Sequence, residues 1–433
     1  MSPRGRTLLP AAVALAAVAL VPNATRAQEI AIVGGTVHPV SGPPIENATV
    51  LIRDGRIVAV GADVAVPDAA RRIDARGKVV TPGLFVPYSQ LGLVEVDLVG
   101  QTRDERMQDD QVTPAFDPVA GLNPRSTLIP FARSGGLTTA VAAPSGGLIA
   151  GLASVIDLAG DTPAGMLVAR RVAMMADFDE GAAAAVGGSR GAAALRLREA
   201  LEDARFWAAR RAAFDRGESR ELTQSRLDLA ALQPVLAGEI PLVVEAHRAS
   251  DILAVLDIAA EFGLRPVILG GTEAWMVAGA LAAEAVPVIL KPRTSLPSGF
   301  ERLGARFDNA ALLAAAEVPI AFTPFENHRA GEITQEAGNA VRWGLSWEEA
   351  LRAVTLTPAE IYGVSDRYGS LAPGRVANVV VWSGDPLELS TRAETVLVRG
   401  RVMPDWSRQK ELLERYRALD DAPRPAYDVP GSR

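Results

Sequence analysis

The sequence predicts an α/β protein with a parallel sheet in its middle and a β-rich segment towards each end. Between residues 241 and 322, short apolar strands alternate with helices, which is typical of right-handed strand-helix-strand crossovers. Residues 30–80 and 377–403 show a different rhythm, in which β-branched runs are separated by tight turns. Of the 433 residues, 48% are hydrophobic and 22% are charged, so the chain can form a substantial core.

The first 27 residues have the pattern of a secretory signal peptide. Arg4 and Arg6 form a basic start, an apolar run covers residues 8–21, and the small residues Thr25 and Ala27 stand at positions −3 and −1 of a cleavage site. The apolar run is shorter than the ~20 residues that a transmembrane helix needs. We therefore expect cleavage after Ala27, export to the periplasm or the medium, and no stable membrane insertion.

The N-terminal β-rich segment, residues 28–80, contains one strong hairpin signal. Asp54-Gly55 lies between two apolar runs, which is the most specific short pattern for a β-hairpin. The C-terminal segment, residues 369–404, repeats this pattern with a strand and a hairpin over 396–403. Because each segment alone would leave an apolar face uncovered, we expect the two to pack together as one discontinuous β-sandwich domain.

The alternation of apolar runs and helical patterns in the middle of the chain predicts successive strand-helix units. The expected strands end at residues 246, 269, 290 and 322, so that 23, 21 and 32 residues separate one strand end from the next. These intervals fit a strand, a helix and two short loops. The expected strands cover 241–246, 266–269, 286–290 and 318–322, and the expected helices between them cover 251–262, 272–284 and 310–316.

Two further helix starts carry a capping-box pattern. Ser346 is followed three residues later by Glu349, and Thr357 is followed by Pro358 and Glu360. After these helices and the C-terminal β-rich segment, the tail of residues 405–433 predicts one charged helix and a proline-rich disordered end.

Charge and residue usage exclude several kinds of function. Lys and Arg number 44 against 51 Asp and Glu, which gives a net charge of −7. This balance argues against a nucleic-acid partner, which requires a basic surface. The chain has no cysteine and only three histidines. A disulfide scaffold, a thiolate nucleophile and a cysteine-ligated zinc site are therefore excluded.

Four short motifs occur in an order that matches a known family. They are Val-Val-Thr-Pro-Gly-Leu at 79–84, Gly-Leu-Thr-Thr at 136–139, a helix start running from Glu-Glu-Ala-Leu to Thr-Pro-Ala over 348–359, and Tyr-Gly-Ser-Leu-Ala-Pro-Gly with a following strand over 368–382. Together they resemble the amidohydrolase superfamily, particularly its imidazolonepropionase-like branch. The resemblance implies a distorted TIM-like (β/α)8 barrel over residues 81–368. It also implies a hydrolase that acts on carbon-nitrogen bonds other than peptide bonds, such as those of cyclic amides.

The same resemblance implies a zinc or another divalent metal at the strand ends, but most of its ligands are replaced here. The family's first strand carries two histidines spaced i, i+2, and Tyr88 and Gln90 take their places. Neither side chain is an ordinary zinc ligand. Gly270 replaces a further histidine, and Thr323 stands where the family has an aspartate. Only His247 aligns with a metal ligand, so the cofactor stays unknown and we expect a degenerate metal site.

The remaining polar residues at strand ends are the candidates for a rebuilt site. We expect His247, Glu245, His328 and Glu326 to carry catalysis, and Tyr88, Gln90, Lys291 and Thr323 to bind the substrate. For the pair Glu326 and His328, the alternative is a solvated surface loop. For Lys291, the alternative to anion binding is a salt bridge.

Two functional hypotheses from different classes remain. The first is an exported hydrolase with a rebuilt site that takes a small amide-like molecule. The second is a non-catalytic relative that uses the barrel to bind a ligand or a partner, as a homo-oligomer or together with a related amidohydrolase. The missing metal ligands favour the second hypothesis, and the family resemblance favours the first.

Overall fold

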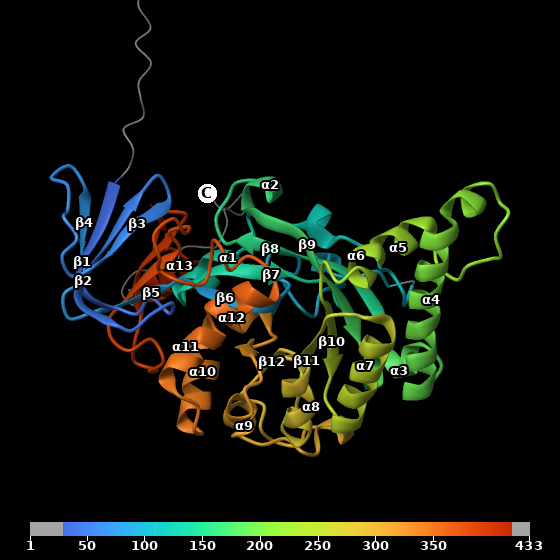
Figure 1. Ribbon diagram of the computed structural model, residues 1–433. Coiled ribbons are helices and arrows are strands. Elements are labelled where there is room, and N and C mark those ends of the chain that lie inside the picture. Colours follow the sequence, from blue (N-terminus) through green and yellow to red (C-terminus); the bar gives the residue numbers. More distant parts are fainter. Residues whose placement is uncertain (1–28, 109, 418–433) are drawn as a thin grey trace, which may run out of the picture.

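The computed structural model describes residues 29–108 and 110–417. The expected signal peptide and the proline-rich end after residue 417 lie outside the described residues. The chain forms two eight-stranded sheets. One consists of the N- and C-terminal strands, and the other forms the barrel. Figure 1 shows the strands of both chain ends together at one side of the molecule, next to the barrel and its helices. No helix in the described ranges has the length and apolar character needed to span a bilayer.

The barrel sheet is an almost closed ring, because its first strand β6 also contacts its last strand β13. Its hydrogen-bonded order follows the chain: β6 (Leu84–Ser89), β7 (Leu137–Ala142), β8 (Ile149–Asp157), β9 (Leu167–Asp177), β10 (Leu242–Ala246), β11 (Pro266–Gly270), β12 (Val288–Leu290) and β13 (Ile320–Phe322). The strands are buried throughout most of their length, as expected when one face packs inside the barrel and the other meets helices.

One strand departs from the regular parallel pattern of a (β/α)8 barrel. β8 runs antiparallel to both β7 and β9. Only residues 143–148 connect β7 to β8, and a parallel crossover requires a dozen or more residues. The barrel therefore contains an antiparallel meander of β7, β8 and β9, and this is how it departs from a regular (β/α)8 barrel. From β9 to β13 every pairing is parallel, as the sequence predicts.

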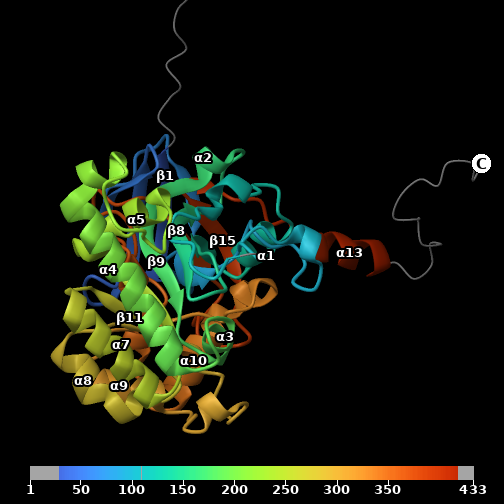
Figure 2. The ribbon, with the colours of Figure 1, turned by 90° about the vertical axis from the view of Figure 1, so that its right-hand side faces the viewer.

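Helices cover the outside of the barrel between its strands (Figure 1). The α-helices are α1 (Leu128–Ser134), α2 (Pro163–Met166), α3 (Glu180–Ala185), α4 (Arg190–Asp215), α5 (Arg226–Ala231), α6 (Gln233–Leu236), α7 (Ala249–Phe262), α8 (Ala278–Ala283), α9 (Asn309–Ala315), α10 (Ile333–Arg342), α11 (Trp347–Ala353), α12 (Leu356–Ile361) and α13 (Arg408–Arg417). The 3-10 helices are η1 (Gly100–Thr102), η2 (Pro118–Gly121), η3 (Ala274–Val277), η4 (Phe300–Arg302) and η5 (Asn327–Glu332). Figure 2 shows α13 extending away from the rest of the molecule.

The first of the two predicted capping boxes is confirmed, and the second is wrong. At the start of α11, the Ser346 hydroxyl accepts from the Glu349 backbone N–H and the Glu349 carboxylate accepts in return. Helix α12 begins one residue before Thr357, with Thr355 as its N-cap residue. Thr355 donates its hydroxyl back to the Leu351 carbonyl at 2.6 Å, so contact with the preceding helix determines this start.

The second sheet joins the two ends of the chain. It contains β1 (Glu29–Val37), β2 (Ile45–Arg53), β3 (Arg56–Gly61), β4 (Arg71–Asp74), β5 (Val79–Pro82), β14 (Val379–Trp382), β15 (Ala393–Val398) and β16 (Arg401–Val402). β5 pairs antiparallel with β14, which links the N-terminal strands to the C-terminal strands. The hydrogen bonding is continuous across all of these strands, so the two segments share one sheet.

The two halves of this sheet also enclose a common core. Ile32 and Ile52 from the N-terminal half pack in one buried cluster with Val381 and Leu397 from the C-terminal half. The Ala377 N–H donates to the Gly55 carbonyl at 2.9 Å, beside the tip of the predicted Asp-Gly hairpin. The sheet therefore curls over itself and buries its apolar face between its own halves.

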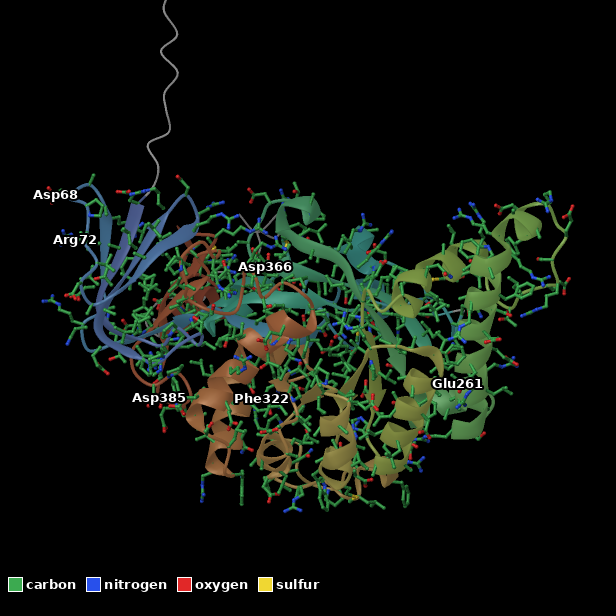
Figure 3. All side chains as sticks on the ribbon, viewed as in Figure 1. Asp68, Arg72, Glu261, Phe322, Asp366 and Asp385 are labelled. Atoms are coloured by element: carbon green, nitrogen blue, oxygen red, sulfur yellow. The ribbon has the colours of Figure 1, made fainter. Side chains whose placement is uncertain are left out.

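Polar contacts hold the two chain ends of this sheet together and connect the sheet to a helix of the barrel. The Trp382 indole N–H on β14 donates to the Thr81 hydroxyl at 2.8 Å, one strand before the barrel begins. The Trp347 indole on α11 donates to Asp385, which is labelled in Figure 3 beside the same helix. These contacts fix the start of β6 and the helices after β13, which flank the candidate site described next.

Candidate functional site

A cavity of about 240 Å³ opens at the carboxyl ends of β10, β11, β12 and β13. This is the end of a βα barrel at which binding sites occur. The charged side chains that line it are Glu245 near the end of β10, His247 directly after β10, Lys291 after β12, Arg302 and Arg306 from the following loop, and Glu326 after β13. Four of the predicted site residues therefore meet here: Glu245, His247, Lys291 and Glu326. In Figure 3, Phe322 marks the end of β13 between the surrounding helices.

His247 is the most enclosed ionisable group of the cavity, with 4% of its surface exposed. Its Nδ1 lies 2.8 Å from the Thr272 hydroxyl. Its Nε2 lies 3.2 Å from a carboxylate oxygen of Glu245 and 2.9 Å from an Arg302 guanidinium nitrogen. Glu245 and His247 are two residues apart at the end of one strand, so their side chains lie on the same face. The contacts with Thr272 at Nδ1 and with Glu245 and Arg302 at Nε2 hold both ends of the imidazole in place.

Lys291 and Glu326 form a tight ion pair across the cavity. The Lys291 ammonium lies 2.6 and 2.7 Å from the two carboxylate oxygens of Glu326. Although burial opposes ionisation, the hydrogen bonds from Lys291 hold the pKa of Glu326 below its ordinary value. The salt bridge that the sequence leaves open for Lys291 is present, and Lys291 also lines the cavity. An ammonium has three donors, so one remains for a ligand.

His328 lies away from this cavity. Its side chain is 56% exposed, and its Nδ1 faces a carboxylate oxygen of Asp97 at 3.4 Å. Glu326 turns inward at the end of β13, whereas His328 lies on the surface of the 3-10 helix η5. The structure therefore does not bring the predicted acid/base pair together, because the chain changes direction between the two residues.

Tyr88, Gln90 and Thr323 are buried near the barrel mouth but are not among the residues that line the cavity. The Gln90 backbone N–H donates to the Asn327 side-chain oxygen at 2.7 Å, and the Asn327 amide donates to the Gln90 side chain at 3.1 Å. The Thr323 hydroxyl donates to the Tyr88 carbonyl at 2.8 Å. Burial raises the pKa of Tyr88 well above its ordinary value. These side chains bond mainly to one another and to the barrel, which favours a structural role.

Sequence reasoning missed three side chains of this region. Arg302 and Arg306 come from the loop between β12 and α9, where no local pattern marks a site residue. Asp177 ends β9 and pairs in register with Glu245 on β10. Burial, together with the charge of Glu245, raises the pKa of Asp177 well above its ordinary value. An acid at the end of an apolar strand is the signal that identified Glu245, and it could have identified Asp177 as well.

The side chains present do not fit a catalytic zinc site. Within residues 29–108 and 110–417, no group of three or more histidine, cysteine, aspartate or glutamate side chains is arranged to hold a metal ion. The one aligned histidine, His247, has both ring nitrogens in contact with protein groups, and one of these groups is a guanidinium. A cation at this position disfavours a metal ion, and a catalytic zinc normally takes three protein ligands.

Comparisons with known proteins agree with this architecture. Residues 323–404 match the Amidohydrolase family. The crystal structure of an amidohydrolase from Thermotoga maritima superposes with a TM-score of 0.80 and 29% identity, covering 88% of this chain and 100% of that one. These matches support the amidohydrolase superfamily. They also support a hydrolase, and the barrel with its additional sheet is the architecture expected of an amidohydrolase.

Curated relatives are longer than this chain or match it only locally. Amidohydrolase tasK of Hapsidospora irregularis is 25% identical over an alignment of 425 positions that covers 86% of this chain and 42% of that protein. A 5-methylthioadenosine/S-adenosylhomocysteine deaminase of Symbiobacterium thermophilum is 44% identical over 61 residues, which are 13% of this chain and 14% of that enzyme. The chain thus spans less than half the length of the curated relatives it matches.

Proposed function

We propose that the chain hydrolyses a carbon-nitrogen bond other than a peptide bond, in a small amide such as a cyclic amide, at the cavity beside His247. The observation that carries the proposal is the pair of His247 and Glu245, whose Nε2 and Oε1 atoms lie 3.2 Å apart at the carboxyl end of the barrel. A carboxylate beside a histidine ring stabilises the imidazolium that forms when the histidine acts as a general base. The cavity of about 240 Å³ limits the substrate to a small molecule.

The reaction can be written with this chain's own side chains. His247 Nε2 takes a proton from a water molecule, whose oxygen attacks the amide carbonyl carbon. Glu245 stabilises the imidazolium that forms, and the free donor of Lys291 faces the oxygen that gains negative charge. The imidazolium then gives its proton to the leaving nitrogen as the carbon-nitrogen bond breaks. The products are a carboxylic acid and an amine. Because the residues do not fit a zinc site, we assign no step to a metal ion.

Two histidine variants test the proposal with a panel of small linear and cyclic amides. His247→Gln should lower kcat/KM by at least about 100-fold, as expected for loss of a general base. His328→Gln is the matched control, because His328 is exposed and faces Asp97 outside the cavity, and it should retain wild-type turnover. Equal activity of the wild type and His247→Gln on every amide that is hydrolysed would contradict the proposal.

The second candidate function is non-catalytic binding of a small ligand in the same cavity. The observation that favours it is that both nitrogens of His247 are already bonded within the protein. In that case no amide of the panel is hydrolysed, while a small ligand raises the thermal midpoint of the wild type and not that of His247→Gln.

We also propose that the protein is exported with cleavage after Ala27, on the basis of the N-terminal sequence pattern. Mass spectrometry of the mature N-terminus tests this directly. A secreted or periplasmic product should begin at Gln28, and a soluble cytoplasmic product that retains residues 1–27 would contradict the proposal.

A further inference from the structure

The two contacts of His247 Nε2 require opposite protonation states of this nitrogen. Arg302 lies 2.9 Å from this nitrogen, and a guanidinium can only donate hydrogen bonds, so the contact requires a lone pair on Nε2. Glu245 lies 3.2 Å from the same nitrogen, and an ionised carboxylate can only accept, so its contact requires a proton there. The shorter distance belongs to Arg302. The shorter contact favours a free protein in which Nε2 accepts from Arg302 and Nδ1 carries the proton towards Thr272.

Arg302 is also the cation of the cavity with the weakest ion pair. Within 4.0 Å it faces one carboxylate among the described residues, that of Glu301, at 3.9 Å. The other Glu301 oxygen is held by Arg190 at 2.9 Å and by the Glu180 N–H at 2.9 Å. The neighbouring cations differ, because Lys291 binds both oxygens of Glu326 and Arg306 binds both oxygens of Asp308.

We propose that Arg302 is the receptor for a carboxylate group on the substrate and that binding of this carboxylate releases His247 Nε2. The inference rests on the proposed hydrolase function and narrows its substrate class to small amides that carry a carboxylate. A bidentate guanidinium-carboxylate pair is shorter and stronger than a hydrogen bond to a neutral imidazole. When an anionic ligand enters the cavity, Arg302 therefore exchanges its weak contact with the imidazole for a strong one with the ligand.

The position of Arg302 in the chain allows this exchange. It ends the short 3-10 helix η4, whose Phe300 is 83% exposed, and Leu303 immediately after it is 64% exposed. Glu301 is buried and anchors the turn to α4 through Arg190. The Arg302 side chain, which is 31% exposed, can thus turn towards a ligand while the backbone of η4 stays in place.

Release of Nε2 couples binding to catalysis. While Arg302 donates to Nε2, the lone pair that must accept the proton of the attacking water is occupied. When Arg302 turns to the ligand carboxylate, this lone pair is free, and the proton it accepts can be shared with Glu245. The charged groups that surround the imidazole are Glu245 on its own strand, Arg302 from η4, and Lys291 and Glu326 across the cavity. A substrate without a carboxylate leaves Arg302 on the histidine and is a poor substrate.

The first test measures binding, without reference to turnover. N-acetylglycine and its neutral counterpart N-acetylglycinamide differ in the carboxylate, and their dissociation constants are measured by calorimetry on the full chain. The wild type should bind N-acetylglycine at least about tenfold more tightly. Arg302→Met should remove this preference. Arg306→Met is the matched control from the same loop, and it should keep the preference because Asp308 already neutralises Arg306.

The second test reads the proton position on His247 from its ring nitrogen signals by NMR, which three histidines keep simple. The free wild type should show the tautomer with the proton on Nδ1. Arg302→Met, and the wild type with N-acetylglycine, should keep the proton on Nδ1 and change the Nε2 signal, because Nε2 then loses the hydrogen bond from Arg302. A wild-type protein that already carries the proton on Nε2, or one that binds both probes equally, overturns the proposal.

The two proposals can fail separately. Tight binding of N-acetylglycine through Arg302 without any amide hydrolysis contradicts the hydrolase and leaves the carboxylate receptor intact. Hydrolysis of neutral amides that depends on His247 and is unchanged in Arg302→Met supports the hydrolase and contradicts the receptor. A circular-dichroism spectrum and thermal midpoint like those of the wild type show that Arg302→Met has folded.

Discussion

The ring of His247 packs directly against the backbone of Gly270. A side chain at position 270 would begin 2.5 Å from the His247 ring carbon Cε1, and Gly270 itself adopts a φ of +91°. The family resemblance places a histidine at this position, so the replacement by glycine and the present orientation of His247 are linked. His247 fills space that a side chain on the neighbouring strand would otherwise take.

Gly270→Ala should therefore damage both stability and the site. The methyl group would clash with His247, and a left-handed backbone with a Cβ costs about 1–3 kcal/mol in addition. We expect a loss of about 2–4 kcal/mol in the free energy of unfolding and weaker ligand binding, measured by denaturant unfolding and calorimetry. Gly279→Ala is the control, because Gly279 lies in helix α8 and an added Cβ meets nothing within 4 Å. It should be neutral or stabilising by up to about 1 kcal/mol, and an equal loss in both variants would contradict this account.

Glu336 on α10 should make the stability of the protein depend on pH. Its side chain is fully buried and accepts from the Arg293 N–H at 2.8 Å. Burial raises the pKa of Glu336 to about 7 from an ordinary value of 4.5. The folded state thus binds the proton more tightly than the unfolded state. The stabilising contribution of the protonated form is complete below about pH 4.5 and is lost as the pH rises through 7.

Glu336→Gln removes this titration. Relative to the wild type, the variant should gain on the order of 3 kcal/mol of stability between pH 4.5 and pH 8, measured as the difference in free energy of unfolding at the two pH values. Glu332→Gln is the control, because Glu332 pairs with the same Arg293 but is 34% exposed, and its effect should stay below about 1 kcal/mol. A parallel stability profile for the wild type and Glu336→Gln would show that Glu336 does not titrate in this range.

Removal of metal ions should leave the protein unchanged. The donor set around His247 lacks the three ligands of a catalytic zinc and includes a guanidinium instead. We expect well under one zinc, iron or manganese per chain by elemental analysis of protein purified without chelators. Chelators should leave the thermal midpoint of unfolding unchanged. A stoichiometric metal that depends on His247 would refute this expectation and point to a rebuilt metal site.

Removal of the C-terminal strands should destabilise the N-terminal strands. A chain that ends at residue 368 lacks β14, so β5 loses its antiparallel partner and Thr81 loses the hydrogen bond from Trp382. We expect a lower unfolding midpoint and lower cooperativity by calorimetry. A chain that ends at residue 417 keeps every described helix and strand and should unfold like the full chain. Identical unfolding of both truncated chains would mean that the shared sheet contributes no stability.

Local patterns in the sequence were sufficient for the regular part of the fold. The rhythm between residues 241 and 322 predicted β10 to β13 and their parallel order, and the structure places these strands within two residues of the predicted limits. The capping box at Ser346 and the Asp-Gly hairpin at Gly55 are likewise present. These features depend on the period of apolar side chains and on turn chemistry within a few residues, and both can be recognised from the sequence alone.

The candidate site was only half predicted. Glu245, His247, Lys291 and Glu326 were found because each follows an apolar strand, and parallel strands bring their carboxyl ends to the same edge. His328 was misplaced because two residues of a turn suffice to point a side chain outwards. The antiparallel direction of β8 was also not foreseen, because the sequence pattern did not mark the short connection of residues 143–148 between β7 and β8.

The sequence by itself determined the order of strands and helices and the strand-end residues that reach the cavity, because neighbouring residues alone specify them. Only the tertiary structure decided that Arg302 contacts His247, which lies 55 positions earlier in the chain. It likewise decided that Trp382 bonds to Thr81 across 301 positions. Such contacts depend on how distant loops and strands pack in three dimensions, and no local spacing encodes the partner of a guanidinium or an indole.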